Sequence, residues 1–271
     1  MKYSIYCYAF NVTLRDYDLE GAIENFIKFV GDEGEVVCAT IKSEDNTAER
    51  LAALTEKFKN FVVVESKLDI TKTNRWDGML KTEAMNACKN KLRIIADIDE
   101  RFLLDSRLIW DRWSEILLNH QKLDGLLIPV IDLYKGMETI KSNGSVGQKF
   151  RLHKDTVYAR GVPSFAELEG GLFRTDMSDS TEPIDINGGL CNFVSIVNAT
   201  HLMPLFVDSL KSFPYVLHFG FLDLERRAKL GATFWKSEWE KRSGKEENVA
   251  TSKIQLEQEP VIMHGLKIEP I

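Results

Sequence analysis

The chain has 271 residues, of which 44% are hydrophobic and 28% charged, so it can bury a sizeable core and does not have the composition of a disordered protein. Its 35 Lys and Arg are outnumbered by 41 Asp and Glu, and the net charge of -6 gives no general attraction to nucleic acid or anionic membranes. The four cysteines lack the spacing of a zinc site, and neither a signal-peptide pattern nor an apolar run of membrane-spanning length is present. We therefore expect a cytoplasmic protein without membrane insertion.

Strands and helices are expected to alternate through the first part of the chain. Short runs rich in β-branched and aromatic residues predict strands at residues 3–10, 35–41, 60–65 and 92–96. Apolar residues at helical spacing predict helices between them, at residues 19–30, 48–58 and 76–88. Because each crossover must return over the sheet, this order predicts a parallel, three-layer α/β arrangement.

Polar residues follow three of the four predicted strands. Asn11 follows the first, residues 43–47 follow the second, and the fourth runs directly into Asp97, Asp99 and Glu100. Ligands of parallel α/β sheets bind at the carboxyl ends of the strands, so these groups are expected at one edge. On an extended chain Asp97 and Asp99 point to the same side, where two carboxylates can chelate a hard divalent cation. Taken alone, the acidic run also fits a solvated turn. Its position at the end of the fourth predicted strand, on the same edge as Asn11 and residues 43–47, favours the cation site. Glu100 is expected to have a structural role.

Further elements are expected after the acidic run. Residues 106–118 have helical spacing, and residues 125–133 form the apolar run of a buried strand. Residues 149–153 and 156–159 fit the two short strands of a hairpin, and residues 217–221 fit another strand that contains a glycine.

A basic helix is expected over residues 224–242, followed by a mostly polar stretch. Trp235 and Trp239 alternate there with lysine and arginine. The pattern fits a solvated amphipathic helix, and it also fits a patch for an anionic acceptor such as nucleic acid.

Several of these motifs together resemble family-2-type glycosyltransferases of the GT-A fold. The first strand with Asn11 resembles their first strand and turn, and Ser-Glu-Asp-Asn-Thr at residues 43–47 resembles their nucleotide-contacting Ser-x-Asp-x-Thr loop. Ala-Asp-Ile-Asp-Glu at residues 96–100 resembles their Asp-x-Asp motif, and Leu-His-Phe-Gly-Phe at residues 217–221 resembles a later His-aromatic-Gly-aromatic element. The resemblance is best over residues 3–135.

The resemblance implies a mostly parallel central sheet flanked by helices, with a short antiparallel C-terminal part. It implies residues 1–135 as the nucleotide-sugar-binding half, residues 136–242 as the acceptor-binding and catalytic half of the same domain, and residues 243–271 as a tail. The implied activity is metal-dependent transfer of a hexose or pentose from a nucleotide-sugar, expected to be a UDP-sugar, to an acceptor hydroxyl. The expected acceptor is a saccharide or a hydroxymethylated base of phage DNA; the oligomeric state is not predicted.

The resemblance also implies roles for individual residues. Asp97, Asp99 and His218 would hold Mn²⁺ or Mg²⁺, with Asp99 as the first ligand and Asp97 acting through water or touching the ribose. The implied nucleotide-sugar contacts are Phe10, Asn11, Ser43, Asp45, Asn74, Arg75, Lys81 and Asp97. If the enzyme inverts configuration, Glu167 is the candidate base that deprotonates the acceptor.

Each of these residue types also has an ordinary structural role. His218 fits a half-buried histidine, Arg75 and Lys81 fit a solvated helix face, and Asp45 fits a cap of the next helix. One departure from the family concerns the residues before the serine loop, where the family usually has an acid and this chain has Thr40 and Ile41.

Two other functions use the same fold. A nucleotidyltransferase that makes a nucleotide-sugar normally has a Gly-rich basic loop after the first strand, and residues 9–13 (Ala-Phe-Asn-Val-Thr) lack it. A non-catalytic protein that binds a nucleotide-sugar is the second alternative, and it would bind the donor without transferring the sugar.

Overall fold

The computed structural model describes most of the first 155 residues and short segments after them. It covers residues 1–69, 76–121, 123–135, 139–141, 147–155, 184–186, 189–191, 193–195, 213–221, 223, 225 and 260–262. The fold below is that of these residues.

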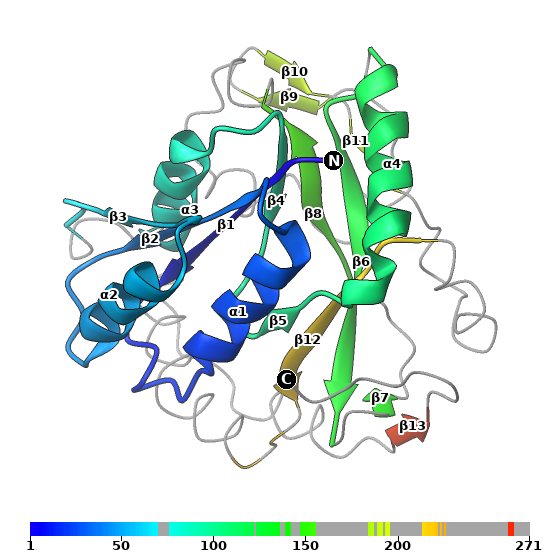
Figure 1. Cartoon of the computed structure of the whole chain (residues 1–271). Coiled ribbons are helices and arrows are strands. Elements are labelled where there is room, and N and C mark those ends of the chain that lie inside the picture. Colours follow the sequence, from blue (N-terminus) through cyan, green and yellow to red (C-terminus); the bar gives the residue numbers. More distant parts are fainter. Residues whose placement is uncertain are drawn as a thin grey trace.

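Strands and helices alternate up to β4, as the sequence predicts (Figure 1). The helices are α1 (Leu19–Val30), α2 (Thr47–Lys57), α3 (Trp76–Ala87) and α4 (Arg107–Asn119). The first strands are β1 (Tyr3–Ala9), β2 (Glu35–Thr40), β3 (Phe61–Glu65), β4 (Leu92–Ile95), β5 (Glu100–Arg101) and β6 (Gly125–Tyr134). The later strands are β7 (Thr139–Lys141), β8 (Gly147–Lys154), β9 (Ile184–Ile186), β10 (Gly189–Cys191), β11 (Phe193–Ser195), β12 (Val216–Phe221) and β13 (Pro260–Ile262).

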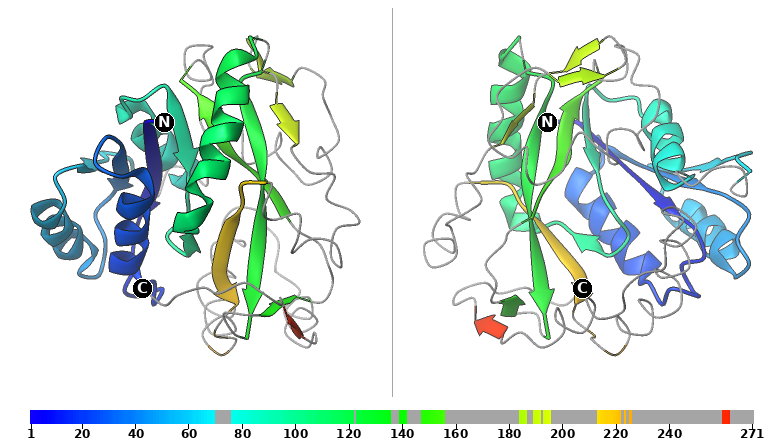
Figure 2. Two further views of the ribbon diagram at one scale, coloured as in Figure 1. Left: turned by 45° about the vertical axis from the view of Figure 1, so that its right-hand side comes forward. Right: turned by 180° about the vertical axis from the view of Figure 1, so that it is seen from behind.

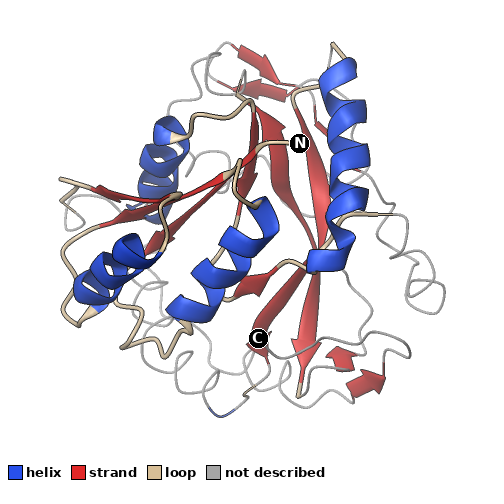
Figure 3. Ribbon diagram, in the orientation of Figure 1, coloured by secondary structure: helices blue, strands red, loops and turns tan. Residues whose placement is uncertain are grey.

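A central sheet with the order β13-β7-β6-β8-β4-β1-β2-β3 organises the molecule. Strands β1, β2, β3 and β4 are mutually parallel, because a helix crosses over between each pair that is consecutive in the chain. The predicted fold class, a mostly parallel sheet flanked by helices, is confirmed (Figure 3).

Strand β8 is the antiparallel member in the middle of the sheet. It pairs with β4 on one side and with β6 on the other, so β6 again runs parallel to β4. The sequence predicts a hairpin of residues 149–153 with residues 156–159. The first run is a strand, but its observed partners are β4 and β6, and residues 156–159 lie outside the described residues.

Two cores cover the two faces of the sheet, because successive side chains of a strand point to opposite sides. Ile5 and Cys7 of β1 pack in one core with α1, α2 and α4, while Tyr6 packs in the other with Leu80 of α3. The helices lie on the two faces of the sheet in the same way in the turned views (Figure 2). Among the described residues, no helix is both long enough and apolar enough to cross a membrane.

The local sequence of α1 determines its buried face and both of its ends. Leu19, Ile23 and Phe26 recur at helical spacing and are all completely buried. The helix begins after Asp18, whose carboxylate accepts a hydrogen bond from the Gly21 amide at 3.0 Å. It ends at Gly31, whose φ of 69° is a conformation that glycine adopts without a steric penalty.

Candidate functional site

The turns after β1, β2 and β4 lie at the carboxyl edge of the parallel strands, where ligands of such sheets bind. Asn11 follows β1 in a left-handed conformation (φ 50°), which asparagine tolerates better than most residues. Its side-chain oxygen accepts from the Glu44 amide at 2.8 Å, and its own amide donates to the Ser43 hydroxyl at 3.2 Å. The predicted nucleotide contacts Asn11 and Ser43 are therefore adjacent.

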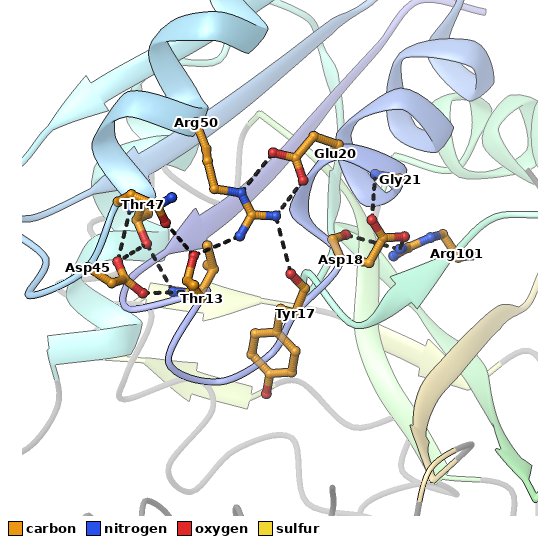
Figure 4. Close-up of polar contacts among 11 residues, drawn as sticks. Thr13, Tyr17, Asp18, Glu20, Gly21, Asp45, Thr47, Arg50 and Arg101 are labelled. Atoms are coloured by element: carbon orange, nitrogen blue, oxygen red, sulfur yellow. Dashed lines mark hydrogen bonds and ion pairs between the residues drawn. The ribbon is translucent and has the colours of Figure 1, made fainter.

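Asp45 joins the same two loops through both carboxylate oxygens (Figure 4). Oδ2 accepts from the amides of Thr13 and Leu14 at 2.8 and 3.0 Å, and Oδ1 accepts from the Thr47 amide at 3.0 Å and from its hydroxyl at 2.5 Å. Burial opposes the charged form, but these hydrogen bonds outweigh it and lower the pKa of Asp45. The contact to the Thr47 amide is the capping role expected as the alternative for Asp45. Contact of Asp45 with the nucleoside stays a prediction.

Arg50 of α2 holds the β1–α1 loop from outside (Figure 4). It donates to Glu20 of α1, to the Thr13 hydroxyl at 2.9 Å and to the Tyr17 carbonyl at 3.5 Å. The hydrogen bonds from Arg50 lower the pKa of Glu20. The loop that carries Asn11 is thus fixed by α1 and α2 before any ligand binds.

Aromatic rings connect this loop to the acidic run after β4. Trp76 of α3 contacts Phe10 and Tyr8 edge-on, with ring centroids 5.1 and 5.7 Å apart. The Lys81 ammonium lies 5.5 Å from the centre of the Tyr8 ring and 2.9 Å from Asp97 Oδ1. Phe10, a predicted nucleotide contact, therefore lies in a continuous line of contacts that leads to Asp97.

Asp97 is held by two cations. Besides Lys81, Arg151 of β8 reaches it, with Nη2 3.4 Å from Asp97 Oδ2. Lys81 is only 4% exposed, so the alternative of a solvated helix face is wrong for this residue. Each carboxylate oxygen of Asp97 therefore has a cationic partner within the protein.

Glu100 is completely buried, in agreement with the structural role expected for it. Its carboxylate accepts hydrogen bonds from Arg151 and, at 2.9 Å, from the Asp97 amide. The Glu100 amide donates back to the Asp97 carbonyl at 3.0 Å, which closes a tight turn. The turn gives Asp97 and Asp99 separate surroundings.

Asp99 faces His218 of β12. Asp99 Oδ2 lies 3.1 Å from His218 Nε2, and the other ring nitrogen, Nδ1, lies 2.5 Å from Asp132 Oδ1 of β6. Burial favours the neutral ring, but the charge of Asp99 and the hydrogen bonds to Asp132 and Asp99 raise the pKa of His218 to about 9. The alternative of an ordinary half-buried histidine does not account for two carboxylates on one ring.

The predicted ligands Asp97, Asp99 and His218 do not form a ready-made cluster. Within the described residues, no three His, Cys, Asp or Glu side chains are grouped so as to hold a metal ion. Asp99 and His218 do fit a divalent cation as an oxygen and a nitrogen donor from facing strands, a set that suits Mn²⁺. Such a site would need further oxygen ligands, of the kind that phosphate groups and water can supply.

Three predicted site residues, Asn74, Arg75 and Glu167, lie outside the described residues. Two residues beside the site were missed, Arg151 and Asp132. The available signal for Asp132 was a charged side chain within an otherwise apolar strand, which is costly unless the charge is paired. Arg151 gave no such signal, because charged and apolar residues alternate along β8.

Comparisons with known proteins give distant structural likenesses. No protein-family model matches the chain. No curated protein matches it in sequence. A crystal structure of S. aureus TarS 1–349 in complex with UDP matches with a TM-score of 0.49 and 13% identity, over 94% of this chain and 70% of that one. The mannosyltransferase PcManGT from Pyrobaculum calidifontis in complex with GDP-Man and Mn²⁺ matches with a TM-score of 0.44 and 11% identity, over 94% and 69%. Likenesses of this extent carry no information about the reaction.

Proposed function

We propose that this protein is a metal-dependent glycosyltransferase that moves a sugar from a nucleoside diphosphate sugar to an acceptor hydroxyl. The observation that carries the proposal is the pair Asp99 and His218, 3.1 Å apart at the carboxyl edge of the sheet, beside Asp97. Asn11 and Ser43, which are in contact, lie at the same carboxyl edge. Together with the sequence resemblance, they support this edge as the nucleotide site.

In this proposal the two aspartates have different tasks. Asp99 and His218 would hold Mn²⁺ or Mg²⁺, and a bound cation offsets the charge that develops on a departing diphosphate. Asp97, which is paired with Lys81 and Arg151, would accept hydrogen bonds from hydroxyl groups of the donor. Phe10, Asn11 and Ser43 position the nucleoside, with Trp76 and Tyr8 behind them.

The finer assignments extend the same proposal. A UDP-sugar with a hexosyl or pentosyl group is the expected donor, and a saccharide or a hydroxymethylated DNA base is the expected acceptor. Asn74 and Arg75 are proposed as further donor contacts, and Glu167 as the base for an inverting reaction. The protein is proposed to act in the cytoplasm.

Calorimetric titration with nucleotide and metal tests the proposal. UDP, UDP-GlcNAc and GDP-Man are titrated with and without Mn²⁺, and at least one is expected to bind only when the metal is present. Asp99→Ala should abolish the metal dependence, while the matched control Asp32→Ala, an exposed loop aspartate, should not. Binding that is equal with and without metal for all nucleotides, or wild-type behaviour of Asp99→Ala, would reject the proposal.

An assay of released products separates the alternatives. A glycosyltransferase releases a nucleoside diphosphate in the presence of acceptor. A nucleotidyltransferase instead releases pyrophosphate from a nucleoside triphosphate and a sugar phosphate. A binding protein of the same fold binds the donor and releases neither product.

A further inference from the structure

Asp132 is a carboxylate in a strand that is otherwise apolar at this point. Its neighbours Val130, Ile131 and Leu133 are at most 4% exposed. The Asp132 side chain itself is 30% exposed, so its charge is only partly desolvated, and a partner offsets the remaining cost. Its contact with His218 Nδ1 at 2.5 Å, across 86 positions of the chain, supplies a partner.

The backbone fixes His218 from both sides. In the sheet register His218 lies opposite Asp132 of β6 and opposite Glu100 of β5. The next amide, that of Phe219, donates to the Asp99 carbonyl at 2.8 Å. The ring therefore lies between the strand that carries Asp132 and the turn that carries Asp99.

The two nitrogens of the ring have separate partners. Nδ1–H donates to Asp132, so Nε2 is the nitrogen that faces Asp99. A histidine can bind a cation only through a nitrogen without a proton, and in the neutral ring the second nitrogen keeps it. A carboxylate that accepts from Nδ1–H thus leaves Nε2 as the nitrogen that can give up its proton to a cation beside Asp99.

We propose that Asp132 is a positioning residue, which fixes the ring orientation and tautomer of His218 so that Nε2 and Asp99 bind one divalent cation. This inference rests on the proposed function, because it assumes the cation site at Asp99 and His218. Asp132 itself is not a ligand of that cation, since it contacts the opposite nitrogen of the ring. Partners of this kind make the imidazole a stronger ligand, and their loss typically lowers metal affinity about 10- to 100-fold.

The test measures Mn²⁺ binding by calorimetry in the full chain, without donor or acceptor. Asp132→Ala should weaken Mn²⁺ binding about 10- to 100-fold. Asp132→Asn, which keeps a neutral acceptor oxygen of the same shape, should show a smaller loss. Asp99→Ala and His218→Ala should remove the site altogether.

A second readout reports the contact itself. In the metal-free, ¹⁵N-labelled protein, the short Nδ1–H bond of His218 should give a low-field proton that exchanges slowly. The signal should persist in Asp99→Ala and disappear in Asp132→Ala, a pattern that a general loss of stability would not produce.

The outcomes separate this inference from the proposed function. If Asp99→Ala and His218→Ala lose Mn²⁺ while Asp132→Ala binds it like the wild type, Asp132 has no positioning role and the proposed function stands. If Asp132→Ala does not fold, the Mn²⁺ affinity of Asp132→Asn is measured instead. An affinity equal to that of the wild type would then overturn the inference. If Asp99→Ala and His218→Ala bind Mn²⁺ like the wild type, both the metal site and the inference are wrong.

Discussion

Arg151 and Glu100 form an ion pair whose side chains are 1% and 0% exposed. A pair of this kind is weak as a net source of stability, because both charges lose their hydration on folding. Removing one partner is different, since the other charge then stays buried without compensation. Arg151 also reaches Asp97, so its loss would disturb the candidate site as well as the core.

We predict that Arg151→Met lowers the free energy of unfolding by about 3–5 kcal/mol, measured by urea denaturation. Adding Glu100→Gln to it should recover part of the loss, because the uncompensated charge is removed. Arg50→Met is the matched control: its ion pair with the half-exposed Glu20 is at the surface, so the change should be below about 1 kcal/mol. Equal effects of Arg151→Met and Arg50→Met would contradict the prediction.

His153 of β8 is buried as a neutral ring. Its Nδ1–H donates to the Lys154 carbonyl at 2.9 Å, so Nε2 accepts from the Tyr6 hydroxyl at 2.9 Å. Burial lowers the pKa of His153 to about 3. The unfolded chain, with an ordinary histidine pKa of about 6.5, therefore binds a proton more readily than the folded protein between these values.

The His153 contribution to stability is thus complete above about pH 6.5 and is lost as the pH falls toward 3, by up to about 1.4 kcal/mol per pH unit. We predict that His153→Gln reduces this pH dependence in urea denaturation series between pH 4 and 7, although it lowers stability at pH 7. The exposed His120→Gln serves as the control and should retain the wild-type slope. A slope in His153→Gln as steep as in the wild type would reject the assignment.

The acidic residues of the site were predictable individually, whereas their partners were not. Asp97 and Asp99 follow a strong strand pattern directly, which is a local signal. Arg151 and Asp132 act through contacts with residues 54 and 86 positions away. No local pattern encodes such distances, and a charged residue inside a strand indicates only that some partner exists.

Asp45 links the start of α2 to the loop after β1, where its partner Thr13 lies 32 positions away in the sequence. One carboxylate accepts from the Thr13 and Leu14 amides after β1 and from Thr47 at the start of α2. The resemblance to a nucleotide-contacting loop predicts that this residue contacts the ligand. The contacts within the protein show that it also shapes the loop.

We predict that Asp45→Ala destabilises the protein by about 1–3 kcal/mol, because several backbone donors lose their acceptor. In Asp45→Ala, the Thr13, Leu14 and Thr47 amides should exchange faster with solvent, because the loop opens locally. The exchange rates of the β4 amides should change only as far as the global stability of the protein changes. Glu44→Ala is the control, because the exposed Glu44 contributes only its backbone amide to the loop and the substitution keeps that amide. Unchanged exchange of the Thr13 and Leu14 amides in Asp45→Ala would contradict the linking role.

The strands β1 to β4 were predicted within one residue at either end, because each combines an apolar run with a clear flanking loop. Strand β8 was only partly recognised, since its pairing is decided by distant partners: Arg93 lies opposite His153, and Leu126 opposite Leu152. Strand β5 has two residues and could not be recognised locally. Its identity comes from pairing with β12.

The insertion of β8 between β4 and β6 ties the two halves of the chain into one sheet. The expected nucleotide-sugar half ends at residue 135. The strands of this half do not form a continuous sheet by themselves, because β8 from the second half lies between β4 and β6. In residues 1–135 alone, the facing edges of β4 and β6 would have no strand between them. Glu100 would also lack Arg151, and Asp99 would lack His218.

We predict that a fragment of residues 1–135 does not fold on its own and regains structure when residues 136–271 are supplied as a second chain. Unpaired strand edges and a buried unpaired carboxylate are both costly, and together they exceed what a marginally stable unit tolerates. Urea denaturation followed by near-ultraviolet circular dichroism should show a cooperative transition for the full chain and for the mixture but not for the fragment. A sharp transition in the fragment would show that the first half has a complete core, and that β8 is dispensable for the strands that carry Asn11, Asp97 and Asp99.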